Sequence, residues 1–246
     1  MDRLIYTAMS GAKQVLEKQA TNTNNMVNAN TTGFRAQIDG FRAVPVSGKG
    51  LATRVQVEDE TVTANYMQGS IRQTGRSLDV AIEGSGWIAV QDADGKEAYT
   101  RAGSLKINQN GILQTQNGQI VLGDSGPIII PFDTALMIGK DGTVSQLPPG
   151  SIPATMEMIG RIKLVNPAQD SLVRAEDGLF RSNAAATAPV DQNVTLIGSS
   201  LEESNVNLLE TMVNMITLGR QFDMQMDMIK KADENAAKAS QIMNLS

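Results

Sequence analysis

The chain has 246 residues, a hydrophobic content of 41% and a formal net charge of −5, and it contains no cysteine and no histidine. The missing histidine removes the commonest general base and the commonest transition-metal ligand, and the absence of a basic cluster argues against a nucleic-acid partner. No apolar run approaches the roughly 18–20 residues of a spanning helix, so we expect no direct membrane insertion.

Residues 1–35 are predicted to form an N-terminal helix with one apolar face, whose residues recur at steps of four and three and so stay on a partner helix. They are Ile5, Ala8, Ala12, Val15, Gln19, Asn22 and Met26, with Met9, Leu16, Ala20 and Val27 as a second row that broadens the face. The opening Met1–Ile5 lacks the continuous apolar core and cleavage site of a secretory signal. We therefore expect either a cytoplasmic protein or export by a route that keeps the N-terminus.

The last turns of this helix are rich in asparagine. The residues are Asn22, Asn24, Asn25, Asn28 and Asn30. Paired asparagines on a helix seam fix register and oligomer state, and we favour hydrogen bonds between subunits over the alternative of an exposed polar face. Gly33 is predicted to end the helix in a left-handed conformation, and Phe34 follows it.

Residues 36–70 are predicted to be a transition segment, and residues 71–190 an all-β outer domain. In the outer domain, short strand-like runs are separated by residue pairs that are typical of hairpin turns. These pairs are Asp94-Gly95, Asn110-Gly111, Asn117-Gly118, Asp141-Gly142 and Asp177-Gly178.

Residues 191–246 are predicted to be a linker and a C-terminal helix that carries a long heptad pattern. Its seam consists of Leu208, Met212, Met215, Gly219, Phe222, Met226, Ile229, Asp233, Ala236, Ser240 and Met243, and Val206, Leu209, Val213 and Ile216 form a second row. A lone helix of roughly 40 residues is marginal in water, so the seam needs a partner, and the N-terminal helix is one candidate. The predicted fold class is α+β, with the two terminal helices paired as a coiled coil, the axial core, bracketing the all-β outer domain.

Three motifs have both a chemical and a structural interpretation. Asp92–Gly95 could begin a calcium loop but lacks the later ligands, which favours a hairpin turn. Gly84–Gly86 could cradle a phosphate but is not followed by Gly-Lys-Ser/Thr and a helix, which favours a β-turn. Glu202 and Glu203 could be catalytic carboxylates, but residues at the start of the C-terminal helix are favoured to cap it. The sequence predicts no catalytic residue, no cofactor and no metal site.

Several motifs in order resemble the axial proteins of the bacterial flagellum, the rod, hook and filament-junction subunits. Asn24–Arg35 resembles their N-terminal signature, although Met26-Val27 stands where the family typically has Leu-Ala, and Leu201–Asn207 resembles the opening of their C-terminal helix. The middle motifs Leu78–Trp87, Tyr99–Gly103 and Asp141–Val144 also resemble theirs. Within this family, the segments Met1–Met9, Phe34–Gln37 and Arg42–Val46 are most similar to the proximal-rod subunits. The distal-rod subunit is the next candidate.

The resemblance implies a structural subunit, not an enzyme, that polymerises helically to form the drive shaft and the wall of the export channel. The implied partners are other proximal and distal rod subunits, further copies of itself, and the junction with the export apparatus and the MS ring. It also implies export without a cleaved signal through the flagellar type III apparatus, and a place in the basal-body rod across the periplasm.

The expected assembly interface lies on the terminal helices and the residues that follow the first of them. It comprises Ile5, Ala8, Ala12, Val15, Asn22, Asn25, Met26, Asn28, Gly33, Phe34, Leu208, Met212, Met215, Phe222, Met226 and Ile229. The methionines of the C-terminal helix are interpreted as an adaptable packing surface rather than ordinary core. Two alternatives stay open: a distal-rod or hook subunit of the same family, and a ligand-binding or enzymatic β domain on a coiled-coil stalk.

Overall fold

A computed structural model describes residues 2–45, 55–131, 134–147, 156–175, 177–183 and 187–244. A helix stands at each end of the described chain, and the elements between them are mostly strands, which confirms the predicted α+β class. The chain divides into two compact units. Unit 1 contains residues 1–29, 37–65 and 206–246, and unit 2 contains residues 30–36 and 66–205. The predicted segments 1–35, 36–70, 71–190 and 191–246 follow chain order instead, and their boundaries stay predictions.

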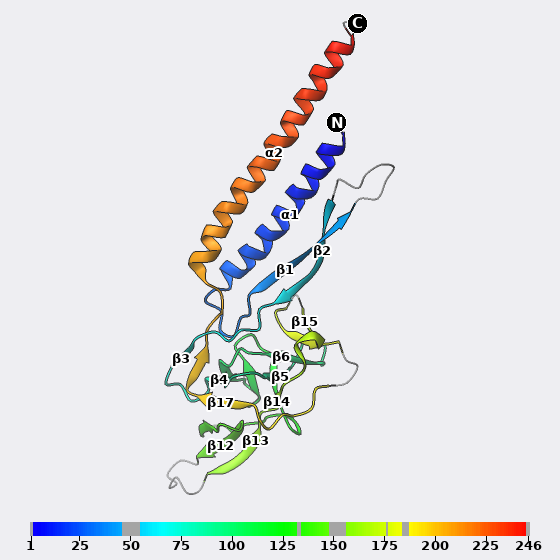
Figure 1. Cartoon of the computed structure of the whole chain (residues 1–246). Coiled ribbons are helices and arrows are strands. Elements are labelled where there is room, and N and C mark those ends of the chain that lie inside the picture. Colours follow the sequence, from blue (N-terminus) through cyan, green and yellow to red (C-terminus); the bar gives the residue numbers. More distant parts are fainter. Residues whose placement is uncertain are drawn as a thin grey trace. The chain divides into compact units, whose positions relative to one another are not determined.

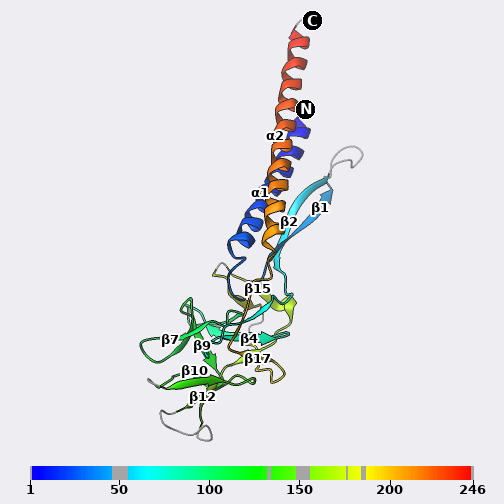
Figure 2. The same ribbon diagram turned by 90° about the vertical axis from the view of Figure 1, so that its left-hand side faces the viewer.

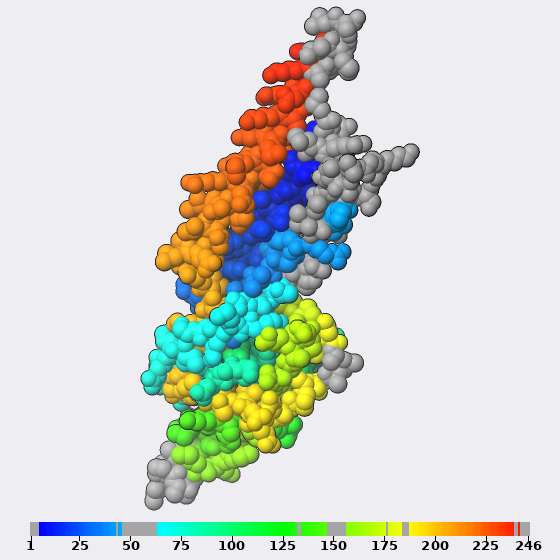
Figure 3. Space-filling view, viewed as in Figure 1, coloured from blue at the N-terminus to red at the C-terminus, as the bar shows by residue number. Residues whose placement is uncertain are grey.

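Unit 1 is a pair of antiparallel helices with a β-hairpin. Helix α1 spans Asp2–Val27 and helix α2 spans Leu208–Asn244. They lie side by side with the two chain ends at the same end of the pair (Figures 1 and 2). Strands β1 (Gln37–Pro45) and β2 (Val55–Ala64) pair antiparallel and contact α1. The space-filling view shows the surfaces of α1 (blue) and α2 (orange) meeting along their shared length (Figure 3).

Helix α1 ends earlier in the chain than the sequence predicts, and helix α2 begins later. Helix α1 ends at Val27, and turns rather than helix lead to Gly33, which adopts φ +69°. Helix α2 begins at Leu208, where the Asn207 side-chain oxygen accepts a hydrogen bond from the Leu209 amide at 3.1 Å. Asn207 is therefore the N-cap. Glu202, which was expected to cap this helix, lies instead in a strand.

Unit 2 is built from short strands, and its largest sheet has nine strands in the order β15-β16-β6-β5-β9-β8-β7, with β10 beside β9 and β14 beside β5. A three-stranded sheet has the order β11-β12-β13, and β17 pairs with β4 and β18 with β3. The strands and the short 3-10 helix are β3 Ile71–Gln73, β4 Val80–Glu83, β5 Trp87–Gln91, β6 Glu97–Thr100, β7 Leu105–Ile107, β8 Leu113–Thr115, β9 Ile120–Gly123, β10 Gly126–Pro127, β11 Ala135–Ile138, β12 Thr143–Leu147, β13 Glu157–Arg161, β14 Leu164–Val165, η2 Gln169–Ser171, β15 Leu172–Arg174, β16 Phe180–Ser182, β17 Thr195–Gly198 and β18 Ser200–Glu202.

The predicted hairpin turns of unit 2 are confirmed. The glycine of each of the five predicted pairs has a positive φ, between 77° and 92°, a conformation that glycine adopts without steric cost. The strands of unit 2 bury one apolar core, in which the side chains of Val80, Ile88, Leu105, Leu113 and Leu196 are fully inaccessible to solvent.

Candidate assembly interface

The inner face of α1 follows the spacing that the sequence predicts. Ala8, Ala12 and Val15 are buried, and Ile5 and Met26 are half-buried. Small residues let the two helix backbones approach closely. A Cβ atom added at Gly11 would lie 3.2 Å from the side chain of Gln225 on α2, tighter than an ordinary contact.

The inner face of α2 differs from the predicted seam by a rotation about the helix axis. Met215, Phe222 and Ile229 are half-buried as part of this face, but its other positions are Thr211, Leu218, Gln225 and Ala232. Each of these four precedes a predicted seam position by one residue, which is about 100° around a helix. Leu208, Met212 and Met226 of the predicted seam are 38%, 44% and 37% exposed, so they lie outside the buried part of this face.

Each helix therefore keeps a second apolar row that its partner does not cover. We call these the open rows: Met9, Leu16 and Val27 on α1, and Leu209, Met212, Val213 and Ile216 on α2. Their side chains are 44–75% exposed. Exposed apolar patches of this kind mark surfaces that bind another protein. The contribution of Leu208, Met212 and Met226 to contacts between subunits stays a prediction. The same holds for the inner-face residues that the sequence also assigns to the assembly interface.

The asparagines near the end of α1 make hydrogen bonds inside the chain. The Asn22 side-chain amide donates to the Thr211 carbonyl of α2 at 2.7 Å. The Asn25 side chain donates to the Gln37 carbonyl at 2.9 Å and accepts from the Gln37 amide at 2.7 Å. Asn28 donates to the Asn24 carbonyl at 2.9 Å. These bonds fix α2 and β1 against α1, and the expected bonds from asparagine to a neighbouring subunit stay a prediction.

The β-hairpin occupies a further side of α1. Thr21 donates a hydrogen bond to the Asp39 carboxylate at 2.6 Å, and the Lys18 ammonium lies 4.8 Å from the centre of the Phe41 ring. With the Asn25 contacts to Gln37, these interactions hold β1 along the helix. Helix α1 is thus covered on two sides within unit 1, and its open row lies on the remaining surface.

In unit 2, three distant motifs converge on a buried ion cluster. Glu202 is 1% exposed, Arg35 1% and Arg101 5%. The Glu202 carboxylate lies 2.7 Å from Nη2 of Arg35 and accepts a hydrogen bond from Nη1 of Arg101 at 2.9 Å. It also accepts a hydrogen bond from the Gly69 amide at 3.1 Å. Because an unpaired buried charge is costly, we infer that these three side chains specify how their segments pack.

Gly33 and Phe34 lie beside this ion cluster, and they do not form the end of helix α1, which stops at Val27. The Gly33 amide donates to the Glu202 carbonyl at 2.8 Å. A Cβ atom at Gly33 would lie 2.3 Å from the carbonyl carbon of Arg101, so only glycine fits. Phe34 is buried, and the Arg174 guanidinium lies 4.4 Å from its ring centre. Arg174 also donates to the Arg35 carbonyl at 2.8 Å.

The Asn205 side chain makes hydrogen bonds to two segments of unit 2 that lie next to the ion cluster in the chain, at Ala36 and at Met67. Its side-chain oxygen accepts from the Ala36 amide at 2.7 Å, and its side-chain nitrogen donates to the Met67 carbonyl at 2.9 Å. Sequence reasoning missed that Arg35, Arg101, Glu202 and Asn205 come together in unit 2, because these residues lie far apart in the chain. The available signal was that Arg35, Arg101 and Glu202 each lie within a motif that resembles the axial proteins.

Neither helix that the structure describes is both long enough and apolar enough to cross a membrane. Among the same residues, no group of three or more histidine, cysteine, aspartate or glutamate side chains is arranged to hold a metal ion.

Three family models match the chain. Residues 5–35 match a model described as flagella basal body rod protein, residues 81–146 the D1 domain of flagellar hook protein FlgE/F/G, and residues 198–242 the C-terminal part of flagellar basal body rod FlgEFG protein. Each matched region contains one member of the buried ion cluster: Arg35, Arg101 and Glu202 respectively.

The chain is also similar to curated proteins over most or all of its length. It is 43% identical to the flagellar basal-body rod protein FlgF of Salmonella typhimurium and to that of Escherichia coli, in each case over 100% of both chains. It is 32% identical to the flagellar basal-body rod protein FlgG of Buchnera aphidicola subsp. Schizaphis graminum, over 89% of this chain and 92% of that protein.

Proposed function

The chain belongs to the flagellar basal-body rod protein family and is a structural subunit of the rod, and from this premise we propose that it is a proximal-rod subunit that polymerises helically through its terminal helices. Its neighbours are other rod subunits and further copies of itself. In this proposal the subunit has no catalytic activity, and its task is to form the wall of a stiff shaft that transmits torque and surrounds the export channel.

The observation that carries the proposal is the pair of open rows. Met9, Leu16 and Val27 face away from α2, and Leu209 and Val213 face away from α1, with exposed fractions between 50% and 75%. Leaving these side chains in water forfeits the free energy of burying them, about 1.5–3 kcal/mol for each large side chain. A contact that joins the open row of one subunit to a different face of the next builds a helical polymer when its rotation does not close into a ring.

The position in the rod and the route to it are further parts of the proposal. The full-length similarity to proteins named FlgF supports a proximal-rod position over a distal-rod or hook position. We propose contacts at the base of the rod with the export apparatus and the MS ring. We also propose that the chain is exported without a cleaved signal and assembles across the periplasm.

The test is a charge in the open row of α2. Val213 is 62% exposed, so Val213→Asp leaves the subunit folded but places a carboxylate in the proposed contact. We expect loss of motility and of complete rods in cells that carry only this variant, while the purified monomer keeps the wild-type Tm. Phe222→Asp is less informative, because Phe222 is half-buried in the helix pair itself.

The matched control is Asn214→Asp. Asn214 is exposed and adjacent in sequence, but it lies about 100° further around the helix. This variant carries the same added charge and is expected to assemble and to support motility. Normal rods built from the Val213→Asp subunit would contradict the proposal. A closed oligomer of fixed size in sedimentation, at all concentrations of the wild-type protein, would instead favour a β domain on a stalk.

A further inference from the structure

The chain passes from one unit to the other at four peptide bonds, which we call the crossings. They follow residues 29, 36, 65 and 205. Within unit 2, the Asn205 side chain accepts a hydrogen bond from the Ala36 amide at 2.7 Å and donates one to the Met67 carbonyl at 2.9 Å. One side chain therefore fixes three segments of unit 2, each within two residues of a crossing.

On the unit 1 side, a second asparagine fixes the residue that follows Ala36. The Asn25 side chain donates to the Gln37 carbonyl at 2.9 Å and accepts from the Gln37 amide at 2.7 Å. Gln37 also pairs with Ala64 of β2, close to the crossing that follows residue 65. The consecutive residues Ala36 and Gln37 are thus fixed to different units, with no residue between them.

The crossing into α2 is almost as short. Asn207 is the N-cap of α2, and its carbonyl accepts a hydrogen bond from the Thr211 amide at 3.0 Å. Val206 is the single residue between Asn205, which is fixed to unit 2, and this cap. A hinge needs residues whose φ and ψ can change, and the crossings after residues 36 and 205 offer one residue at most.

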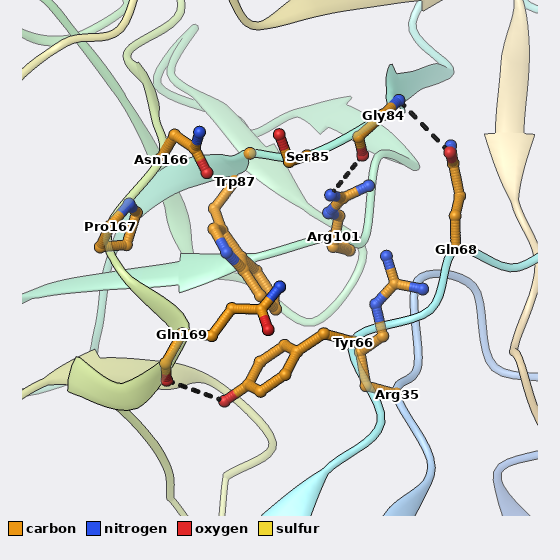
Figure 4. Close-up of a pocket in the computed structure, with 11 residues that line it drawn as sticks. Arg35, Tyr66, Gln68, Gly84, Ser85, Trp87, Arg101, Asn166, Pro167 and Gln169 are labelled. Carbon is orange, nitrogen blue, oxygen red and sulfur yellow. Dashed lines mark hydrogen bonds between the residues drawn. The ribbon is translucent and has the colours of Figure 1, made fainter.

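Unit 2 also anchors the segment that follows residue 65. Figure 4 shows the Tyr66 hydroxyl pointing at Gln169, to whose carbonyl it donates a hydrogen bond at 3.4 Å, and Gln68 beside Gly84. The Gln68 side-chain oxygen accepts from the Gly84 amide at 3.3 Å, and the Tyr66 ring lies 6.2 Å from the Trp87 ring, centre to centre. These five residues help to line a pocket of about 230 Å³. The Asn205 side chain thus binds a segment that is itself fixed within unit 2.

We propose that Asn25 and Asn205 are two clamps that limit the rotation of one unit against the other and so stiffen the subunit. Asn25 holds Gln37 to unit 1, Asn205 holds Ala36 to unit 2, and the peptide bond between them is planar. A rotation at this crossing has to break a clamp or distort the backbone. Stiffness is of use in a shaft that transmits torque, and in this respect the inference rests on the proposed function.

Asparagine suits this task because its side-chain amide has both an acceptor oxygen and a donor NH₂ group. Asn25 uses both groups on one residue, and Asn205 uses them on two segments. The simpler interpretation is that the two side chains only satisfy backbone groups and add stability. The two interpretations differ in whether loss of a clamp changes the motion between the units.

The experiment measures that motion in the purified monomer. The sequence contains no cysteine, so Lys96→Cys in unit 2 and Asp223→Cys on α2, both at exposed positions, provide the two sites for nitroxide labels. Pulsed electron paramagnetic resonance then gives the distribution of distances between the labels. We expect a narrow distribution for the wild-type background, and a broader one for Asn25→Ala and for Asn205→Ala.

The expected broadening follows from the position of the label on α2. Asp223 lies about 22 Å along the helix from Leu208 at 1.5 Å per residue. A released residue gains at least the ordinary scatter of backbone dihedrals, about 15–20°. A rotation of this size moves the label by about 6–8 Å, and we expect the distribution to widen by about that amount.

The matched control is Asn22→Ala. Asn22 and Asn25 lie on the same helix and are each 9% exposed, and Asn22 donates to the Thr211 carbonyl at 2.7 Å. That bond joins α1 to α2 within unit 1 and touches no crossing. We expect this variant to lose about as much Tm as Asn25→Ala does, while its distance distribution stays as narrow as that of the wild-type background.

Two results would overturn the proposal. One is a distribution for Asn25→Ala and Asn205→Ala that is no broader than that of the wild-type background. The other is equal broadening by Asn22→Ala, which would assign the effect to lost stability. The measurement uses the monomer, so it decides on the clamps whether or not rods form. Normal rods from the Val213→Asp subunit would contradict the proposed function and leave the clamps unaffected.

Discussion

Glu202→Gln is the substitution that most directly tests the buried ion cluster. The change keeps the size and shape of the side chain but removes its charge. It also replaces one acceptor oxygen by an NH₂ group that faces a guanidinium donor. Arg35 and Arg101 then remain buried, at 1% and 5% exposure, without the carboxylate that contacts both.

The size of the effect follows from the burial of all three side chains. Removing one partner of a buried ion pair costs about 3–5 kcal/mol, because the charge left behind is uncompensated. This cost is a large fraction of the 5–15 kcal/mol that holds a typical domain folded. For a unit of this size, each kcal/mol lowers Tm by about 2–4 °C. We therefore expect Tm of unit 2 to fall by about 6–20 °C.

The assay is thermal unfolding followed by the fluorescence of Trp87, which reports on unit 2 because Trp87 lies 5.5 Å from the Arg101 guanidinium. The control is Glu203→Gln at the next position. The Glu203 side chain is 43% exposed, and it accepts hydrogen bonds from Ser70 and Arg72 at 2.8 Å each. Exposed ion pairs contribute little to stability, so this variant should unfold at nearly the wild-type temperature.

A Tm for Glu202→Gln close to that of Glu203→Gln would refute the reasoning. It would mean that water or a rearranged side chain compensates the two arginines, so that the cluster does not decide how the three motifs pack. A fall in Tm for both variants would show instead that the loss of either acidic side chain from strand β18 or its neighbour is enough to loosen the strand.

Two further substitutions test other parts of the fold. Gly33→Ala is expected to prevent folding of unit 2 at 37 °C, because Gly33 has φ +69° and an added Cβ would lie 2.3 Å from the Arg101 backbone. Gly75→Ala is the control: Gly75 has φ +77° but nothing within 4 Å of an added Cβ, so this variant should lose only about 1 kcal/mol of stability. Thermal melts followed by circular dichroism compare the two variants, and equal melts would contradict this expectation. Burial raises the pKa of Asp92, but hydrogen bonds from Arg181 and from backbone amides lower it by more, so its folded pKa lies below the ordinary value. The stabilisation from the ionised Asp92 carboxylate is therefore complete above pH about 4 and is lost as pH falls through the folded pKa. The Tm difference between wild type and Asp92→Asn should shrink as pH is lowered from 6 to 2.5. A Tm difference that stays constant over this range would exclude a stabilising role of the Asp92 charge.

The sequence alone determined the features that depend on neighbours along the chain. The heptad spacing of Ala8, Ala12 and Val15 fixes one face of α1, because side chains three and four residues apart share a helix face. The Asp-Gly and Asn-Gly pairs fix the hairpin turns of unit 2, because glycine is needed where φ is positive. Both features are local, so the residues that produce them can be read directly from the printed sequence.

Only the tertiary structure decided which of two overlapping rows on α2 pairs with α1. Both rows contain Met215, Phe222 and Ile229, and they differ by one residue at the positions between, so the spacing suits either choice. The close approach at Gly11 and the bond from Asn22 to the Thr211 carbonyl select the row with Thr211 and Leu218. Among the positions that only the other row contains, Leu208, Met212 and Met226 are exposed.

The role of Glu202 was likewise beyond local reasoning. An acidic residue before a long helix is equally compatible with capping, and nothing in its own segment distinguishes the two roles. Strand β18 pairs with β3 and carries Glu202 into contact with Arg35 and Arg101, which come from distant parts of the chain. Charge pairing in a protein interior depends on which segments meet in space, and sequence spacing carries no information about that meeting.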